Sequence, residues 1–330
     1  MMKWLAFLAI ALAGCGAPPP SASITSPSAA ASAAVSPQAS ETSSCRLPVR
    51  YVTAAQGAGP YESGFLTIPG LAFSPAAEED SGGHFYARAT GRWVPVGPPA
   101  LSPDGGRYAY IEGDINHSQA FVVDVRTGTQ SVLASGGPWQ GVGLTGDAYY
   151  AMSVEYRVSV AYGSLPIGKG LWRFPLDGGA SAQLTADSRF WTWVDEYAAY
   201  ADLTTGDVAG GPNSILRFDL TTRQLTTWFD HHKRSRLLAV DATGAGFVRA
   251  EAGNEELWRV PLSGEPVNVW SGESSDFRPE RPVAVAGTDV WFSSAMGAMG
   301  SAIYRYTLRD GLEKVAAFGD RPVAVSGTCV

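Results

Sequence analysis

The sequence of 330 residues has little positive charge, and it lacks the short motifs of common enzymes. Lysine is nearly absent, the formal net charge is −7 and the isoelectric point is near 5.2. Because a nucleic-acid surface needs a basic patch or stripe, we expect no nucleic-acid partner. No G-x-S-x-G, H-E-x-x-H, C-x-x-C or P-loop motif is present. The few histidines could join a Ser-His-Asp triad only if distant loops converged, so no catalytic residue and no cofactor is predicted.

One segment, Gly141–Gly146, has the spacing of a dinucleotide-binding glycine motif. Asp147–Ser153 follows it with the pattern of a strand, whereas pyrophosphate binding needs a helix N-terminus at that point. We therefore interpret the glycines as a turn.

The N-terminus contains the one apolar run that suggests export. Met1-Met2-Lys3 gives a positive start, and Trp4–Ala13 is unbroken apolar sequence, too short to span a bilayer stably. The following Leu12-Ala13-Gly14-Cys15 resembles the bacterial lipobox. The resemblance implies that residues 1–14 are a signal peptide and that Cys15 carries the lipid that attaches the protein to the membrane. The alternative is an ordinary secretory signal with an incidental Cys15.

The segment after Cys15 is almost wholly Ala, Ser, Pro and Thr up to Ser44, with Glu41 as its one charge. Such a composition cannot bury enough apolar surface to offset the entropy of ordering it, so residues 15–44 are predicted to be a disordered tether. In Gram-negative lipoprotein sorting, Asp after the lipidated cysteine retains a protein at the inner membrane. Gly16 therefore favours the outer membrane.

Residues 45–330 have a repetitive pattern that predicts the fold. Six similar segments occur, and beyond the first their starts lie roughly 40 to 50 residues apart, the period of four-stranded propeller blades. They are His84–Ala89, Ala120–Val125, Leu171–Leu176, Ile215–Leu220, Leu257–Leu262 and Ile303–Leu308. Alternate large apolar residues indicate strands with one buried face, and a polar turn and another strand follow each segment. With two apolar runs upstream of each segment, the sequence predicts an all-β propeller of four-stranded antiparallel blades.

The segment Leu101–Tyr110 contains Ser-Pro-Asp-Gly and resembles the strand-turn-strand phrase of TolB-like and related WD-type propeller repeats. It occurs clearly once. The resemblance implies a propeller of the cell envelope that binds a partner and has no catalytic site.

The C-terminus predicts how the ring closes. Arg281–Val290 recurs as Arg321–Val330, so a new blade begins where the sequence stops, and residues after Cys45 would complete it. Six blades are predicted, with seven as the alternative because Leu47–Phe73 is hard to divide. If Cys15 is lipidated, Cys45 and Cys329 remain, and in an oxidising compartment we expect a disulfide that locks this seam rather than two free thiols.

The longer links between strands fall on one face of such a propeller, where binding groups are usual. They are Glu155–Gly170, Thr204–Asn213, Phe229–Arg236, Ser271–Arg281 and Ser294–Ser301. The one dense basic run lies there, and with an arginine of another link it forms the candidate binding face: His231, His232, Lys233, Arg234, Arg236 and Arg278. It suits an anion, a lipid headgroup or an acidic partner; the alternative is a solvated loop balanced by Asp230. No carboxylate at ligand spacing completes a metal site with the paired histidines.

Two other sets are interpreted as structural. One arginine recurs at the same strand position in four repeats, and we expect its head to be paired between blades rather than to form an anion-binding ring. These residues are Arg173, Arg217, Arg259 and Arg305. Tryptophans are expected in the core rather than in a sugar platform: Trp139, Trp191, Trp193 and Trp270.

The sequence therefore predicts a lipid-anchored binding scaffold that contacts an envelope protein or a wall component through its long-loop face. The alternative is a propeller hydrolase or lyase that acts on glycan or peptide with loop carboxylates. Two carboxylates close together at the propeller axis would favour the enzyme.

Overall fold

The computed structural model describes residues 44–52, 60–80, 82–114, 117–159, 163–203, 214–231, 234–252, 254–273, 277–297, 300–319 and 321–330. The chain divides into two units, Met1–Thr42 and Ser43–Val330, and all elements named below lie in the second. In the described ranges every regular element is a β-strand except the short 3-10 helix η2 (Glu78–Asp80), so the prediction of an all-β domain is confirmed. No helix in these ranges has the length and hydropathy needed to cross a bilayer. Cys15 and the predicted signal peptide lie outside them.

Five sheets have four antiparallel strands each, and their order along the sheet follows the chain in four of them. Their strands are β9 (Trp139–Leu144), β10 (Ala148–Ser159), β11 (Gly163–Pro175) and β12 (Ala182–Thr185); β13 (Phe190–Val194), β14 (Ala198–Leu203), β15 (Ser214–Asp219) and β16 (Leu225–Asp230); β17 (Arg234–Val240), β18 (Gly246–Ala252), β19 (Asn254–Val260) and β20 (Val267–Gly272); β21 (Pro279–Ala286), β22 (Asp289–Gly297), β23 (Gly300–Thr307) and β24 (Gly311–Ala317); and β25 (Val323–Val325), β1 (Cys45–Tyr51), β2 (Glu62–Ile68) and β3 (Phe73–Pro75).

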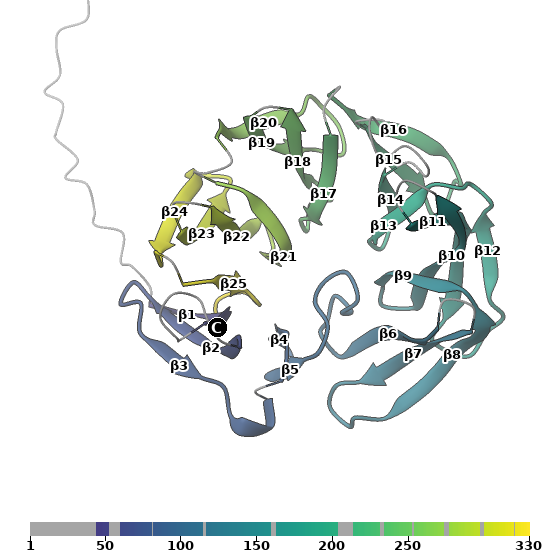
Figure 1. The fold of residues 1–330 in the computed structure, drawn as a ribbon, viewed down its shortest axis with the longest axis horizontal. Helices are drawn as coiled ribbons and strands as arrows, with labels where there is room; N and C mark the ends of the chain where they lie inside the picture. The colour runs from purple at the N-terminus through teal and green to yellow at the C-terminus, as the bar shows by residue number, and fades with distance from the viewer. Residues whose placement is uncertain are drawn as a thin grey trace, which may run out of the picture. The chain divides into compact units, whose positions relative to one another are not determined.

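Two sheets are smaller. One holds β6 (Arg107–Gly113), β7 (Ser118–Asp124) and β8 (Gln130–Gly137), and an isolated bridge from Leu101 to Tyr108 takes the place of a first strand. The other is the hairpin of β4 (Phe85–Ala87) and β5 (Arg92–Val94). Figure 1 shows the sheets of this unit standing around a common centre, with β13, β17, β21 and β25 nearest to it. This arrangement of four-stranded antiparallel sheets is that of a β-propeller.

The predicted repeats correspond to the third strands of their sheets. Five of the six segments fall on β7, β11, β15, β19 and β23. The prediction of one buried face is only partly right. Val260 and Tyr306 are buried, but so are Leu257 and Ile303 on the other face of the same strands, because a sheet in the ring is covered on both faces. The first segment, His84–Ala89, differs: it forms one strand of the two-stranded hairpin rather than part of a four-stranded sheet.

The two ends of the described chain share one sheet, as the recurrence of Arg281–Val290 predicts. β25 pairs with β1 in the register Val49 to Val325, and β21 holds the same first position in its own sheet. Beyond β25, the N–H of Arg46 donates to the carbonyl of Val330 over 3.3 Å and the N–H of Val330 donates back over 3.1 Å. The predicted Cys45–Cys329 disulfide is present beside this pair, with a Cα–Cα distance of 5.4 Å.

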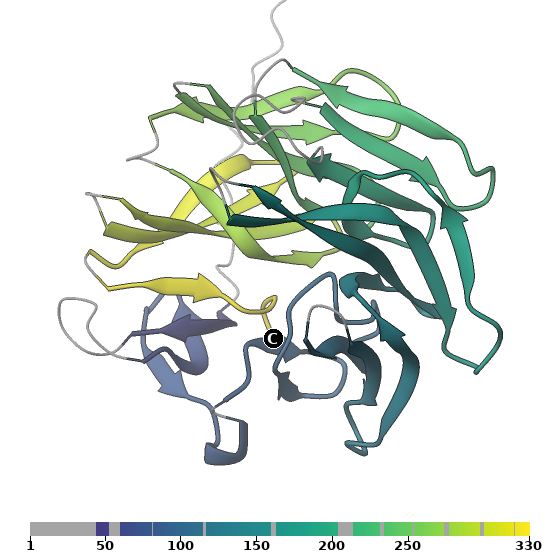
Figure 2. The same ribbon diagram turned by 45° about the vertical axis from the view of Figure 1, so that its right-hand side comes forward.

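The links on the long-loop face are shorter than predicted. Most of Glu155–Gly170 continues the ladder of β10 and β11 as far as Ser159 opposite Gly163, and Figure 2 shows the resulting long hairpin in teal. Likewise most of Ser294–Ser301 belongs to β22 and β23. Their glycine and polar residues resemble loop sequence, yet antiparallel pairing satisfies their backbone groups and extends the strands. Thr204–Asn213 lies outside the described residues.

The tryptophans lie where the sequence predicts. Trp191 and Trp193 of β13 are buried. Trp139 packs edge-on against Phe174 with ring centroids 5.2 Å apart, and Trp270 packs edge-on against Phe277 at 5.1 Å. Trp139 and Phe174 belong to the same sheet, and Phe277 lies in the link from β20 to β21. Edge-on aromatic pairs of this kind stabilise the packing around them.

Candidate functional site

The described residues of the predicted basic run differ in their exposure. His231 follows β16 and is half-buried: its ring centroid is 4.3 Å from that of Trp258, and its Nε2 lies 3.4 Å from Oε2 of Glu256. His232 and Lys233 lie outside the described residues. Arg234 and Arg236 are exposed on β17, and no acidic partner lies within ion-pair distance of either among the described residues.

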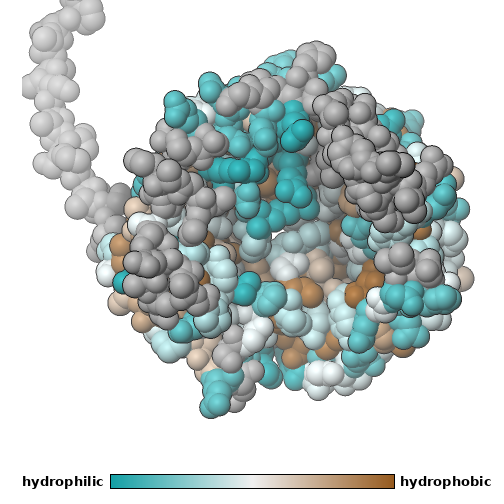
Figure 3. Space-filling model, viewed as in Figure 1, coloured by the Kyte–Doolittle hydropathy of each residue, from teal (hydrophilic) through white to brown (hydrophobic). Residues whose placement is uncertain are grey.

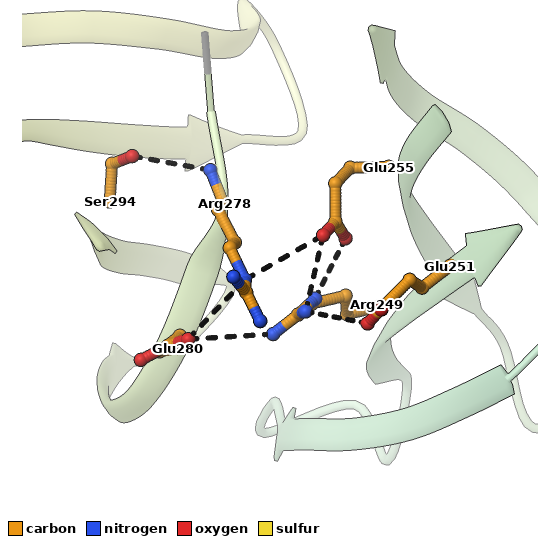
Figure 4. A network of polar contacts seen from close by, with 6 residues as sticks. All are labelled: Arg249, Glu251, Glu255, Arg278, Glu280 and Ser294. Carbon is orange, nitrogen blue, oxygen red and sulfur yellow. Dashed lines mark hydrogen bonds and ion pairs between the residues drawn. The ribbon is translucent and has the colours of Figure 1, made fainter. Parts of the chain in front are cut away.

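Arg278, the sixth residue of the candidate binding face, belongs to a network of charges between two sheets (Figure 4). Its Nε lies 3.5 Å from Oε1 of Glu280 and 3.7 Å from Oε1 of Glu255. Its backbone N–H donates to Oγ of Ser294 over 3.2 Å. The Arg278 head is thus already surrounded by carboxylates, which lowers its capacity to bind an added anion.

The centre of this network is a buried ion pair that the sequence analysis missed. Arg249 on β18 donates to Glu255 on β19 from Nε over 2.8 Å and from Nη2 over 3.1 Å, and it also donates to Glu251 over 2.8 Å. Both Arg249 and Glu255 are buried. Only the register of the hairpin brings these charges together, so no sequence motif marks them. Figure 3 shows hydrophilic residues gathered beside the centre over β17, β18 and β21.

Antiparallel partners point to the same side of a sheet, and Arg236 is the register partner of Arg249, as Arg234 is of Glu251. The fold therefore does bring Arg234, Arg236 and Arg278 to one place, the boundary between the sheets of β17 and β21. Part of the predicted binding face is assembled, but with three glutamates among its arginines: Glu251, Glu255 and Glu280.

Arg281 connects three sheets at the centre. From β21 its Nη1 donates to the carbonyl of Thr192 on β13 over 3.3 Å, and its Nη2 donates to the carbonyl of Leu237 on β17. Its guanidinium lies over the ring of Trp193, 5.3 Å from the centroid. This arginine holds the first strands of three sheets together.

The recurring arginines pair within their own sheets, so the prediction of pairing between blades is wrong. Arg173 pairs with Asp147 at 2.5 Å, Arg259 with Asp241 at 3.2 Å, and Arg305 with Asp289 at 2.5 Å. The reason is topological: each aspartate lies at the turn from the first to the second strand, and that turn ends beside the third strand. Arg217 differs and pairs with Asp219 of its own strand at 3.3 Å. These heads are occupied and form no open ring of anion-binding groups.

A cavity of about 950 Å³ lies at the other end of the first strands, where the short turns to the second strands meet. We call it the axial cavity. Its lining comes from Leu101–Gly105, Leu144, Trp193–Tyr197, Val240–Ala242 with Gly244, Val285–Gly287 and Thr328, together with Pro98, Pro99 and the hairpin segment Phe85–Ala89. No signal in the sequence marks this end of the first strands, because none of the longer links lies there.

The hairpin and the C-terminal tail form one wall of the axial cavity. The N–H of Tyr86 donates to the carbonyl of Ser326 over 2.6 Å, and Thr328 and Tyr86 both line the cavity. The segment that lacks a four-stranded sheet therefore helps to build the cavity.

Four carboxylates line the axial cavity, and two of them are fully engaged in the fold. Asp195 accepts the N–H groups of Tyr197 and Ala198 and the hydroxyl of Tyr200, each over 2.8 Å. Asp241 is buried; it accepts the N–H groups of Thr243 and Ala245 and pairs with Arg259. These aspartates hold their turns, as aspartate commonly does.

The other two carboxylates each keep one oxygen open. Oδ1 of Asp104 accepts the Ser102 hydroxyl over 2.7 Å and the Gly106 N–H over 3.0 Å, and these hydrogen bonds hold the pKa of Asp104 below its usual value. Oε1 of Glu196 accepts the Gly146 N–H over 2.9 Å. Within the described chain, no hydrogen bond to the second oxygen of either side chain is found, and both side chains are exposed. The Ser-Pro-Asp-Gly segment thus lies on the cavity rim.

The rest of the lining is mainly apolar. Phe85, Leu101 and Trp193 contribute to the walls, and Tyr197 stands at the rim with 70% of its surface exposed. Arg88 is the one cation among the lining residues, all of which belong to the described chain. No cluster of three or more His, Cys, Asp or Glu residues suited to a metal ion occurs in the described part of the protein.

Comparisons with known proteins add little beyond the fold. No protein-family model matches the chain, and no curated protein matches it. Among solved structures, TolB from Acinetobacter baumannii is 16% identical, with a TM-score of 0.48, over 86% of this chain and 67% of TolB. An oligogalacturonate lyase in complex with manganese is 12% identical, with a TM-score of 0.44, over 78% and 71%. An acylaminoacyl peptidase from Pyrococcus horikoshii is 11% identical, with a TM-score of 0.46, over 84% and 46%.

Removing the buried Arg249 and removing the half-exposed Arg278 should lower the free energy of unfolding by different amounts. Arg249→Met leaves the carboxylate of Glu255 buried without its main partner, and we expect the free energy of unfolding to fall by about 3 to 5 kcal/mol. Arg278→Met removes a head whose side chain is 45% exposed, and a loss of about 1 kcal/mol or less is expected. Urea unfolding followed by tryptophan fluorescence measures both. Equal losses in the two variants would contradict the assignment of Arg249 as the centre of the network.

Proposed function

We propose that this protein is a lipid-anchored binding protein of the cell envelope that holds its ligand in the axial cavity. The observation that carries the proposal is the cavity itself: an apolar space of about 950 Å³ at the meeting point of the first strands, with carboxylate oxygens fixed at its rim. Ligand sites are usually largely apolar clefts with a few well-placed polar groups.

We propose six blades, with the hairpin of β4 and β5 as an insertion. Five first-strand positions reach the cavity, namely Leu101 and β9, β13, β17 and β21, and the tail that follows β25 reaches it at Thr328 as the sixth. Pairing of β25 with β1 then closes the ring. In the seven-blade alternative the hairpin is a reduced blade; its hydrogen bond to Ser326 supports the simpler description as a wall of the cavity.

Binding is supported over catalysis by the state of the carboxylates. The alternative, a propeller hydrolase or lyase, is favoured by one observation, since Asp104, Asp195 and Asp241 reach one cavity from three sheets. A general acid at neutral pH needs a raised pKa, whereas hydrogen bonds lower that of Asp104. Both oxygens of Asp195 and of Asp241 are held by their own turns or by Arg259. These groups are suited to holding positive charge rather than to transferring protons.

The long-loop face remains a second proposed contact surface. Arg234 and Arg236 are exposed on a sheet edge near the centre, and they suit an acidic envelope protein or wall component. The two surfaces lie at opposite ends of the first strands, so a ligand in the axial cavity and a partner at these arginines would not compete for the same residues.

A bulky side chain at the cavity rim tests the proposed site. Ala242 is exposed and lines the cavity, so Ala242→Trp should fill the entrance without disturbing the core. We expect recovery of the ligand from detergent-solubilised envelopes to fall at least about tenfold, the loss that 1.4 kcal/mol of binding energy produces. Ala180→Trp is the matched control, because Ala180 is exposed and does not line the cavity.

Native mass spectrometry and affinity recovery would measure small and large ligands respectively. The proposal is wrong if the Ala242→Trp protein still recovers the ligand in full while a variant with Ser at both Arg234 and Arg236 loses it. That result would mean that the ligand binds at the long-loop face and not in the cavity.

Lipidation is tested at Cys15. If it carries the anchor, the wild-type protein partitions into the detergent phase, because each buried methylene of a lipid chain adds about 0.8 kcal/mol of membrane affinity. Cys15→Ser should shift the protein to the aqueous phase, while Ser21→Ala in the predicted tether should leave the partition unchanged. A Cys15→Ser protein that stays in the detergent phase would disprove the proposed anchor.

A further inference from the structure

We infer that the axial cavity takes a small organic cation with an apolar body, such as an alkyl- or arylammonium compound. The inference rests on the proposed function in one respect, since it requires that the cavity be the ligand site. It goes further by assigning the charge and the size of the ligand, which neither the sequence motifs nor the comparisons supply.

The charge of the ligand follows from the lining. Four carboxylates and one cation, Arg88, belong to the described lining. Outside the lining, Arg259 pairs with Asp241, and the charge of Arg107 helps to lower the pKa of Asp104, so the lining keeps more negative than positive charge. The rim therefore has an excess of negative charge beside an apolar interior. A cavity of this kind concentrates positive ligands and disfavours anions.

The position of the positive group follows from the two open oxygens. One oxygen of Asp104 and one of Glu196 are fixed by hydrogen bonds, which hold each carboxylate in place before a ligand arrives. The Gly146 N–H that binds Glu196 belongs to the turn between β9 and β10, so Asp104 and Glu196 flank this turn from the neighbouring sheets. Preorganised acceptors bind an ammonium group with little further loss of conformational entropy.

The apolar body follows from the walls. Trp193 and Tyr197 are among the lining residues, and aromatic rings attract both apolar groups and cations. The large exposed surface of Tyr197 is unusual for a tyrosine on a short turn and is explained if a ligand covers it. The volume falls within the range of sites that enclose small molecules.

Arg88 provides the most specific test, because its positive charge repels a cationic ligand. It lies on the hairpin wall and is exposed, and it has no acidic partner among the described residues. Removing a carboxylate should weaken binding of a cation, and removing Arg88 should strengthen it. If the substitutions merely disturbed the structure of the rim, they would all change the affinity for the cation in the same direction.

The probes are 4-phenylbutylammonium and its neutral analogue 4-phenylbutanol, measured by isothermal titration calorimetry on the folded, disulfide-bonded protein. We expect the ammonium to bind with a dissociation constant of about 1 mM or tighter and at least about fivefold more tightly than the alcohol. The preference should decline with added salt, because exposed charges are screened.

Three variants complete the experiment. Asp104→Asn and Glu196→Gln keep the carbonyl oxygen that accepts the structural hydrogen bond, and each should weaken ammonium binding about two- to fivefold and leave the alcohol unchanged. Arg88→Gln should strengthen ammonium binding by a similar factor. Asp177→Asn is the matched control, since Asp177 makes the same kind of turn hydrogen bond outside the cavity.

Equal affinity for the ammonium and the alcohol, or no binding of either, would overturn the assigned ligand class. Tighter binding of a lysine-containing peptide than of every small amine would overturn the assigned size. If either result accompanied loss of the envelope ligand in Ala242→Trp, the cavity would stand as the site and only its ligand would be wrong.

Discussion

The pairing of β25 with β1 is the constraint on which the other features depend. The other sheets each form from one stretch of chain, whereas this sheet joins strands from the two ends of the described chain. The tail beyond β25 then binds Arg46 and carries Thr328 into the cavity wall. The Cys45–Cys329 bond closes a loop with a sequence separation of 284 residues, which restricts the unfolded chain.

The two ends of the first strands have opposite electrostatic organisation. At the long-loop end, Arg249 and Arg278 are held by three glutamates, and two arginines of β17 remain exposed. At the short-turn end, aspartates fix the turns, and Arg173, Arg259 and Arg305 neutralise those that lie beside a third strand. Among the described residues, no arginine lies within ion-pair distance of Asp104 or Glu196, although the charge of Arg107 helps to lower the pKa of Asp104. The negative rim is therefore a consequence of turn chemistry in the two places where the recurring ion pair is missing.

Local patterns in the sequence were sufficient for the parts of the structure that repeat. The repeated apolar segments predicted the third strands, and the recurrence of Arg281–Val290 predicted the shared sheet. The disulfide was predicted from the two cysteines that remain besides Cys15. The candidate site was harder to predict, because it depends on contacts between distant residues. Asp104 and Asp241 both resemble ordinary turn residues, and only the hydrogen bonds to Ser102, Gly106 and Arg259 show which carboxylate keeps an open oxygen. The prediction of a long loop at Glu155–Gly170 was also wrong in part, because β10 and β11 pair along most of it.

The central claim is that the ligand enters at the short-turn end, and photo-crosslinking in intact cells tests it directly. A benzophenone amino acid would replace Tyr197 at the cavity rim in one protein and Arg236 at the long-loop face in another; both positions are exposed. The account predicts a crosslinked ligand, seen as a discrete mass increase, from position 197. A discrete adduct from position 236 with none from position 197 would contradict it.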